Sequence, residues 1–286
     1  MKDINSRLRI KLKLLTHLIA KIEKDDVFAL ASQLAYYLML SFFPFMLFLM
    51  TLVGFSDLNS GEILDALSLI LPKKILELTQ STIKEVSDNQ YTGLLGLSIV
   101  LMMWTASSAF KAIIKSVNKT YNIKENRSFI KVSIISMLGI LALALIIILT
   151  LTMLVFGNVI EEYIKNIDGL YEIIFILWNI FRYAFIFIIM ILIFAVIYRF
   201  VPAKRLTWKE VIPGSMFSTI GWIFVSFVFS FYIDNFNNYS RFYGSLGAVF
   251  ILMTWLFLIS MMIILGVEIN FITTEIKNKS QSLGYR

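Results

Sequence analysis

Six long apolar stretches dominate the pattern of hydrophobic and polar positions along the chain. They cover residues 27–53, 93–112, 132–156, 173–199, 211–233 and 245–271, and a more polar segment separates each from the next. A helix needs roughly 20 apolar residues to cross the hydrocarbon core of a bilayer, and each stretch reaches that length. The pattern therefore predicts an all-α polytopic membrane protein with about six transmembrane helices within residues 27–272.

Residues 1–26 have the pattern of an amphipathic helix. Leu8, Leu12, Leu15, Ile19 and Ile22 recur at spacings of three and four, while lysines occupy other faces. This arrangement is typical of a helix that lies at the cytoplasmic membrane surface. Two roles stay open for it: a basic anchor to anionic lipid, and a gating element.

A large polar insert, residues 54–92, follows the first apolar stretch. It is acidic, and its apolar positions predict two short amphipathic helices, with Pro72 suited to the start of the second. We expect these helices to form a cap on the outer face of the bundle. Residues 273–286 are predicted to be a cytoplasmic tail.

The distribution of lysine and arginine predicts the orientation in the membrane. Twenty of these residues fall in the N-terminus, 111–131, 199–210 and the C-terminal tail, and only five in the alternate segments 54–92, 157–172 and 234–244. Cytoplasmic segments carry the excess of positive charge. Both termini are therefore predicted to be cytoplasmic.

Composition agrees with a membrane protein and removes much enzyme chemistry. Of the 286 residues 58% are hydrophobic and 16% are charged, and the mean hydropathy is +0.80. The chain has no cysteine and a single histidine, His17, which leaves no disulfide, zinc cluster or Cys or His nucleophile. We predict no catalytic, cofactor-binding or metal site, and the net charge of +7 needs no nucleic acid to explain it.

Three spans carry polar side chains at helical spacing. We take nine residues as a candidate substrate path. Seven come from the first, second and fifth spans, and the last two of the list come from the fourth: Gln33, Tyr36, Tyr37, Ser41, Trp104, Ser218, Trp222, Asn179 and Arg182. Small hydroxyl residues in membranes often serve tight helix packing. The stripes are therefore compatible with packing or with a polar cavity. Pro44 interrupts the first span and is expected to kink it.

Ionisable residues inside spans are costly in lipid and must face protein or water. Arg182 shares a helix face with Asn179, and we expect it either to attract an anionic group of a substrate or lipid, or to pair with Asp234 or helix-end carbonyls. Glu268 lies near the inner end of the sixth span, beside Asn270. Lys111, at the inner end of the second span, is the predicted partner of Glu268.

Several of these segments carry a family resemblance. The segment ALASQLAYYLMLSFFPFMLFLM from Ala29 to Met50, the Asn118 and Tyr121 of NKTY, and the block from Tyr243 and Gly244 through Glu268 to Asn270 resemble the YihY/BrkB family. Val201-Pro202, Trp208, Gly214, Trp222 and Tyr232 fit as well. The resemblance implies a bacterial inner-membrane protein of six spans, usually described as a permease or exporter and once labelled ribonuclease BN.

The sequence argues against a nuclease, because phosphodiester cleavage generally requires clustered carboxylates or histidines that hold metal ions. The carboxylates here are scattered between the two predicted membrane faces. We expect a transporter, either an exporter or a lipid-handling permease with an anionic or amphipathic substrate. The alternative is a membrane scaffold or a regulator of the cell envelope that transports nothing.

The predicted topology is testable because the chain lacks cysteine. Single cysteines at Ser60, Ser87 and Asn166 should react with a membrane-impermeant thiol reagent in intact cells, since these positions are predicted to lie outside. Cysteines at Ser6, Asn126 and Ser280 should react only after lysis. Labelling of the second set in intact cells would overturn the orientation.

Overall fold

The computed structural model describes residues 16–54, 92–141, 171–235 and 246–282, and all regular secondary structure within these ranges is helical. A short helix over residues 16–24 leads through a turn into α2 (Val27–Gly54). The longer helices that follow are α5 (Thr92–Thr120), α7 (Tyr171–Phe200), α8 (Trp208–Asn235) and α10 (Leu246–Ser282). A further apolar helix, Phe129–Leu141, lies between α5 and α7 in the chain.

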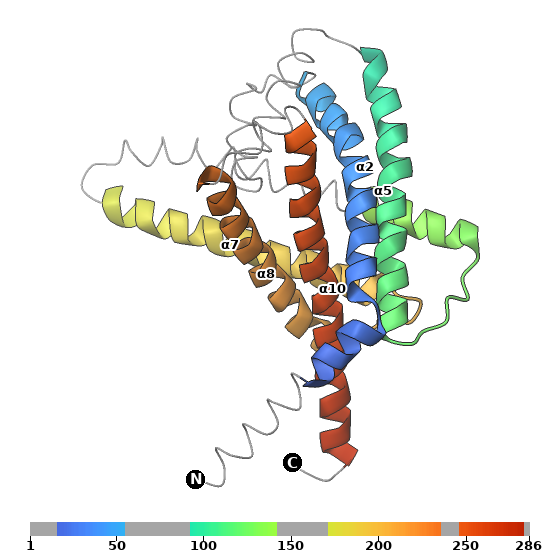
Figure 1. Cartoon of the computed structure of the whole chain (residues 1–286). Coiled ribbons are helices and arrows are strands. Elements are labelled where there is room, and N and C mark those ends of the chain that lie inside the picture. Colours follow the sequence, from blue (N-terminus) through green and yellow to red (C-terminus); the bar gives the residue numbers. More distant parts are fainter. Residues whose placement is uncertain (1–15, 55–91, 142–170, 236–245, 283–286) are drawn as a thin grey trace.

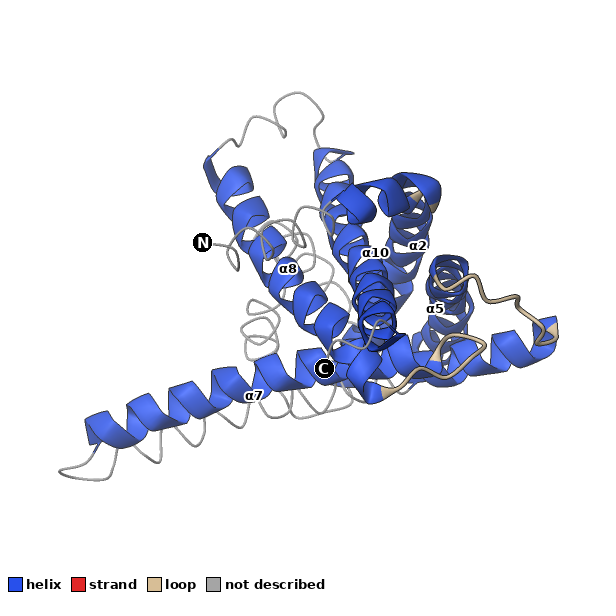
Figure 2. Cartoon of the chain, turned by 90° about the horizontal axis from the view of Figure 1, so that it is seen from below, coloured by secondary structure: helices blue, strands red, loops and turns tan. Residues whose placement is uncertain are grey.

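Helices α2, α5 and α10 run side by side, and α8 packs against the other flank of α10 (Figure 1). Helix α7 packs against α8 and extends away from the bundle, as the view from below shows (Figure 2). Its buried residues, Phe194, Ala195, Ile197 and Tyr198, all lie near its C-terminal end. The first part of α7 therefore has few neighbours among the described helices.

Four of the described helices are long and apolar enough to cross a membrane, judged by length and composition. They are Ile99–Thr120, Ile176–Phe200, Trp208–Ile233 and Val249–Asn278. Val27–Phe42 and Phe129–Leu141 are shorter apolar helices that fall in the first and third predicted spans. The prediction of a multi-span helical protein is confirmed, with four candidate spans in the described part of the chain.

Two helices continue beyond the ends of the predicted spans. The second span is predicted to end at 112, but α5 continues to Thr120, because Ile113, Ile114 and Val117 extend its buried face by two turns. The last span is predicted to end at 271, but α10 continues to Ser282 through most of the predicted tail. Three groups of residues lie outside the described part of the chain: 55–91 of the predicted cap, Tyr243 and Gly244, and residues 1–15 of the amphipathic segment.

The core lies where α2, α5 and α10 meet. Buried side chains of α2 include Ala31 and Leu34, and they belong to one apolar cluster with Ala109 and Val117 of α5 and Ile264 of α10. Small residues let helix backbones approach closely, and the resulting van der Waals packing is one of the contributions that hold helices together in lipid. Helix α2 runs through Pro44 without a break in its helical assignment.

Helices α8 and α10 cross at a pair of glycines. A Cβ atom on Gly214 would lie 2.0 Å from the carbonyl oxygen of Gly266, and one on Gly266 would lie 2.0 Å from Ser218 Oγ. No heavy atom can occupy either position while the helices keep this spacing. The crossing therefore depends on glycine at both positions.

Replacing Gly214 with alanine should destabilise the protein by about 1–3 kcal/mol, because the new methyl group meets the backbone of α10. Gly96→Ala on α5 is the matched control, since nothing lies within 4 Å of its Cβ position, and alanine there should be neutral or stabilising by up to about 1 kcal/mol. Denaturing-detergent titration followed by circular dichroism measures both. Equal stability of the two variants would contradict the close crossing.

Candidate functional site

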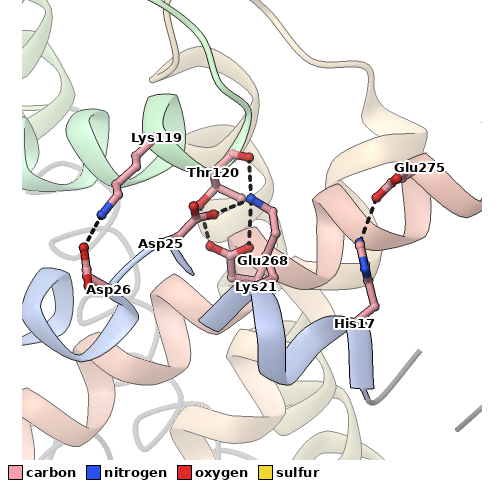
Figure 3. Close-up of polar contacts among 8 residues, drawn as sticks. All are labelled: His17, Lys21, Asp25, Asp26, Lys119, Thr120, Glu268 and Glu275. Atoms are coloured by element: carbon pink, nitrogen blue, oxygen red, sulfur yellow. Dashed lines mark hydrogen bonds and ion pairs between the residues drawn. The ribbon is translucent and has the colours of Figure 1, made fainter. Parts of the chain in front are cut away.

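Four buried polar residues meet where the N-terminal helix, the end of α5 and α10 come together (Figure 3). We call them the buried ionic cluster: Lys21, Asp25, Thr120 and Glu268. They come from the N-terminal helix and the turn that follows it, from the last residue of α5, and from α10. Lys21 is 7% exposed, Asp25 is 4% exposed, and Thr120 and Glu268 are 0% exposed. Three ionisable groups are thus removed from solvent at one place.

The ammonium group of Lys21 lies at the centre of the cluster. It forms an ion pair with Asp25, donates a hydrogen bond to the Thr120 carbonyl at 3.0 Å, and lies 3.9 Å from Glu268 Oε2. Thr120 Oγ1 donates to Glu268 Oε1 at 2.6 Å. The Lys21 Nζ atom also lies 4.4 Å from the ring centre of Phe271, a favourable cation–π distance. The cluster therefore ties three segments together.

Two helix ends position these side chains. Helix α5 ends in a Schellman motif: the Ile123 N–H donates to the Asn118 carbonyl, and the Asn122 N–H donates to the Lys119 carbonyl. Asn122 takes the left-handed conformation that this motif needs, with φ of 52°. The motif stops the helix at Thr120, so that the backbone carbonyl and the hydroxyl of this residue both reach the cluster.

The turn between the N-terminal helix and α2 makes the second positioning element. Asp26 has φ of 53°, a conformation that Asp tolerates better than most residues. Lys21 and Asp25 are four residues apart, a spacing at which side chains on a helix face one another. The turn therefore directs both side chains toward α10.

Two more ion pairs lie around the cluster (Figure 3). Lys119 Nζ lies 2.7 Å from Asp26 Oδ2, and His17 Nε2 lies 3.0 Å from Glu275 Oε2. Both pairs are partly exposed to solvent, so that each contributes little to stability. The first pair joins α5 to the turn before α2, and the second joins the N-terminal helix to α10. The buried cluster joins the same segments.

Tyr121 follows the cluster in sequence and packs edge to face on Phe271, with ring centres 5.4 Å apart. Its hydroxyl is buried and has no hydrogen-bond partner among the described residues. Burial raises the pKa of Tyr121 well above its usual value, and the carboxylates of Glu210 and Glu268 raise it further. Tyr121 is therefore a neutral hydroxyl donor at any physiological pH.

A second polar contact joins the loop after α5 to the loop after α7. Asn118 donates to Glu125 Oε2 at 2.8 Å, and its own side-chain oxygen accepts from the Ala203 N–H at 3.0 Å. Arg127 donates to Glu125 and to the Val201 carbonyl. The hydrogen bond from Arg127 lowers the pKa of Glu125 to about 2. This ion pair therefore persists down to strongly acidic pH.

Helices α8 and α10 share a line of hydrogen bonds above the cluster. The Gly214 N–H donates to Asn270 Oδ1 at 2.6 Å, and Ser218 Oγ donates to the Met262 carbonyl at 3.0 Å. Tyr198 of α7 reaches Ser218 at 2.7 Å. The polar side chains Ser215, Ser218 and Thr219 are all fully buried, so the α8 stripe lies within the contact between helices.

The structure corrects the predicted partner of Glu268. Lys111 is not near Glu268: its Nζ atom lies 4.6 Å from the ring centre of Phe129. The basic residue beside Glu268 is Lys21. The predicted pair assumed that α5 ends near 112, whereas Lys111 lies nine residues before Thr120, or about 13 Å along the helix at 1.5 Å per residue.

Of the four candidate path residues on α2, one makes a side-chain hydrogen bond to α5. Gln33 accepts a hydrogen bond from Lys115 Nζ at 3.3 Å and so joins the two helices. Tyr36 and Tyr37 contact each other with ring centres 5.6 Å apart, Tyr36 exposed and Tyr37 packed against the core. Ser41 is buried and bonds to a carbonyl of its own helix.

The remaining path candidates are spread over three helices. Trp104 on α5 is 74% exposed. Asn179 and Arg182 are half-buried on α7, and Trp222 on α8 packs against an apolar cluster of α8 and α10. Glu268 contacts Thr120 and Lys21, and Asn118 contacts Glu125 and Ala203. Within the described part of the chain, the nine path residues do not form one site.

Sequence reasoning missed the partners that complete the cluster. Lys21 and Asp25 carry a usable signal, a basic and an acidic residue four apart just before an apolar span. Thr120 carries none, because a threonine gains its role only from the position at which α5 ends. Tyr198 likewise looks like one more aromatic residue of an apolar span.

Long apolar helices packed through small residues, with a buried ionic cluster at one end, define a polytopic helical membrane protein. The family model named Virulence factor BrkB matches residues 18–284. The chain therefore belongs to the BrkB family, which confirms the resemblance found in its sequence.

Two relatives cover most of the chain. The ribonuclease-like protein YfkH of Bacillus subtilis (strain 168) is 36% identical over 240 residues, which cover 84% of this chain and 87% of YfkH. A UPF0761 membrane protein of Pseudoalteromonas atlantica is 25% identical over 262 residues, which cover 87% of this chain and 82% of that protein. No solved structure matches the chain.

Removing the cation of the buried cluster should be costly. Lys21→Met leaves two carboxyl groups facing each other without a counter-ion, and we expect a loss of about 3–5 kcal/mol in the free energy of unfolding. The matched control is Lys119→Met, whose ion pair with Asp26 is exposed (37% and 67%) and should cost about 1 kcal/mol or less.

Both variants can be measured by denaturing-detergent titration at pH 7 beside the unsubstituted protein. A Lys21→Met protein as stable as Lys119→Met would mean that the cluster does not hold the N-terminal helix in place.

Proposed function

We propose that this chain is a transport protein of the bacterial cytoplasmic membrane, a permease or exporter that moves an anionic or amphipathic solute. The observation that carries the proposal is the burial of three ionisable side chains in a helical membrane protein. Charges inside membrane helices are costly, and they commonly mark solute or ion pathways. Glu268, one of the three, lies within the candidate span Val249–Asn278.

The orientation in the proposal follows the positive-inside rule. Segments rich in lysine and arginine lie at the end of the bundle that holds the cluster: the loop after α5 contacts the loop after α7, and His17 contacts Glu275 near the end of α10. We take this end as the cytoplasmic one, which gives both termini the same side. The basic surface would attract anionic lipid head groups there.

Arg182 is the proposed contact for the anionic part of the solute. It lies within the candidate span Ile176–Phe200, eleven residues after the start of α7, and its side chain is half-buried. A guanidinium group offers a fork of donors that matches phosphate and carboxylate oxygens. Arg182 and the buried ionic cluster lie on different helices, so the two would act on the solute at different stages.

An enzymatic function is not part of the proposal. YfkH is named as ribonuclease-like, but cleavage of a phosphodiester generally uses metal ions held by clustered carboxylates. In the cluster, the position between Asp25 and Glu268 is occupied by the ammonium group of Lys21. That geometry favours charge compensation over metal binding.

Transport is tested with the full-length protein reconstituted in lipid vesicles. The probes are a fluorescent phospholipid with an acidic head group, its zwitterionic counterpart, and radiolabelled inorganic phosphate. We expect the protein to speed the crossing of at least one anionic probe over protein-free vesicles. Arg182→Gln should lower that rate at least about tenfold, the effect of losing one charged hydrogen bond worth about 1.5 kcal/mol.

Lys124→Gln, in the exposed loop after α5, is the control and should leave the rate unchanged. Arg182→Lys should lose most of the rate while staying folded, because lysine keeps the charge but not the fork of donors. No crossing of any anionic probe would contradict transport and favour the scaffold alternative. A full rate in folded Arg182→Gln would eliminate the substrate contact alone.

A further inference from the structure

The buried ionic cluster holds more acid than base. Asp25 and Glu268 contribute two carboxyl groups, and Lys21 contributes one ammonium group. All three side chains are less than 10% exposed. With both carboxyl groups ionised the cluster would carry a net charge of −1 without access to water, a state that burial strongly disfavours.

The two carboxyl groups have unequal partners. Asp25 forms the close ion pair with Lys21, whereas Glu268 Oε2 is 3.9 Å from the same ammonium group. Glu268 Oε1 accepts from Thr120, but Oε2 is buried and has no hydrogen-bond partner among the described residues. Lys21 is the shared cationic neighbour of both carboxyl groups. One ammonium group can offset the charge of only one carboxylate, and a proton on the other carboxyl group would remove the remaining charge.

No further cation in the described surroundings offsets the excess charge. Lys119 pairs with Asp26 at the surface, His17 pairs with Glu275, and Lys24 is exposed. The other titratable group that the described elements bring near Glu268 is Tyr121 after α5, a neutral hydroxyl.

A metal cation fits the cluster poorly. Lys21 Nζ already takes up the space among Asp25, the Thr120 carbonyl and Glu268. Hard cations prefer several oxygen ligands around them, and a second cation here would be repelled by the ammonium group. A proton needs only one carboxyl oxygen, and Glu268 Oε2 is buried without a hydrogen-bond partner among the described residues.

We propose that Asp25 and Glu268 together bind one proton at neutral pH, as a proton-binding site at the junction of the N-terminal helix, α5 and α10. The bound proton leaves the cluster neutral, with Lys21 paired to one carboxylate and the other carboxyl group uncharged. Its release leaves a buried negative charge where residues 16–26 meet α10. Binding or release of this proton therefore changes the stability of the contact between the N-terminal helix and α10.

Infrared difference spectroscopy of the full-length protein in vesicles tests the site directly, because a protonated carboxyl group has a carbonyl stretch that a carboxylate lacks. The measurement is made at equilibrium without any solute, so its outcome does not depend on transport. We expect one buried carboxyl band at pH 7 that disappears as the pH is raised. Glu268→Gln should lose this band, because Asp25 is then the one carboxyl group of the cluster and stays ionised in its pair with Lys21.

Asp25→Asn should lose the same band, because Glu268 then ionises to pair with Lys21. Glu125→Gln is the control: Arg127 keeps Glu125 ionised at pH 7, so the band should be retained. Circular dichroism and size-exclusion chromatography establish that each variant is folded. Gln and Asn preserve the shape of the protonated side chains, which favours folding in both.

Three outcomes would overturn the proposal: no carboxyl band at pH 7, a band that persists in folded Glu268→Gln, or a band that persists in folded Asp25→Asn. Repeating the titration in choline in place of sodium adds a further check. The band should be the same in both salts. A band that appears only when sodium is removed would show that a metal cation, and not a proton, occupies the site.

Discussion

The end of the bundle that holds the buried ionic cluster depends on one constraint, the need to give the buried carboxyl group of Glu268 partners inside the fold. Its carboxyl group is completely buried, and an uncompensated buried charge costs several kcal/mol. Its partners are Thr120, which donates a hydrogen bond, and Lys21, whose ammonium group lies 3.9 Å away. The Schellman motif ends α5 where Thr120 can reach Glu268. Because Lys21 lies in the N-terminal helix, its contact with Glu268 also determines where residues 16–24 dock.

The same requirement for internal partners governs the contact between α8 and α10. Lipid offers no hydrogen bonds, so buried polar groups must bond within the protein. Ser218 and Asn270 do so across the crossing, and the glycines at 214 and 266 bring the backbones close enough for these bonds. The contact therefore depends on two glycines that allow close approach and on two polar side chains, Ser218 and Asn270, that form hydrogen bonds across it.

Much of the architecture is predictable from sequence because long apolar runs have few alternatives in a bilayer. Glu268 and Asn118 also stand out as polar residues in or beside apolar runs. The partner of Glu268 was not predictable in the same way. Lys111 and Lys21 are equally basic in the sequence, and the choice between them depends on the point at which α5 ends. That point is set by Asn122 in a Schellman motif, a local feature that hydropathy does not register.

The central claim is that the buried ionic cluster holds the N-terminal helix against α10. A double variant with cysteines at His17 and Glu275, whose side chains lie 3.0 Å apart, tests it in native membranes with a short thiol-specific cross-linker. The chain has no other cysteine. Efficient cross-linking that falls sharply when Lys21→Met is added is the predicted result. Absence of the cross-link, or the same yield with and without Lys21, would contradict the account.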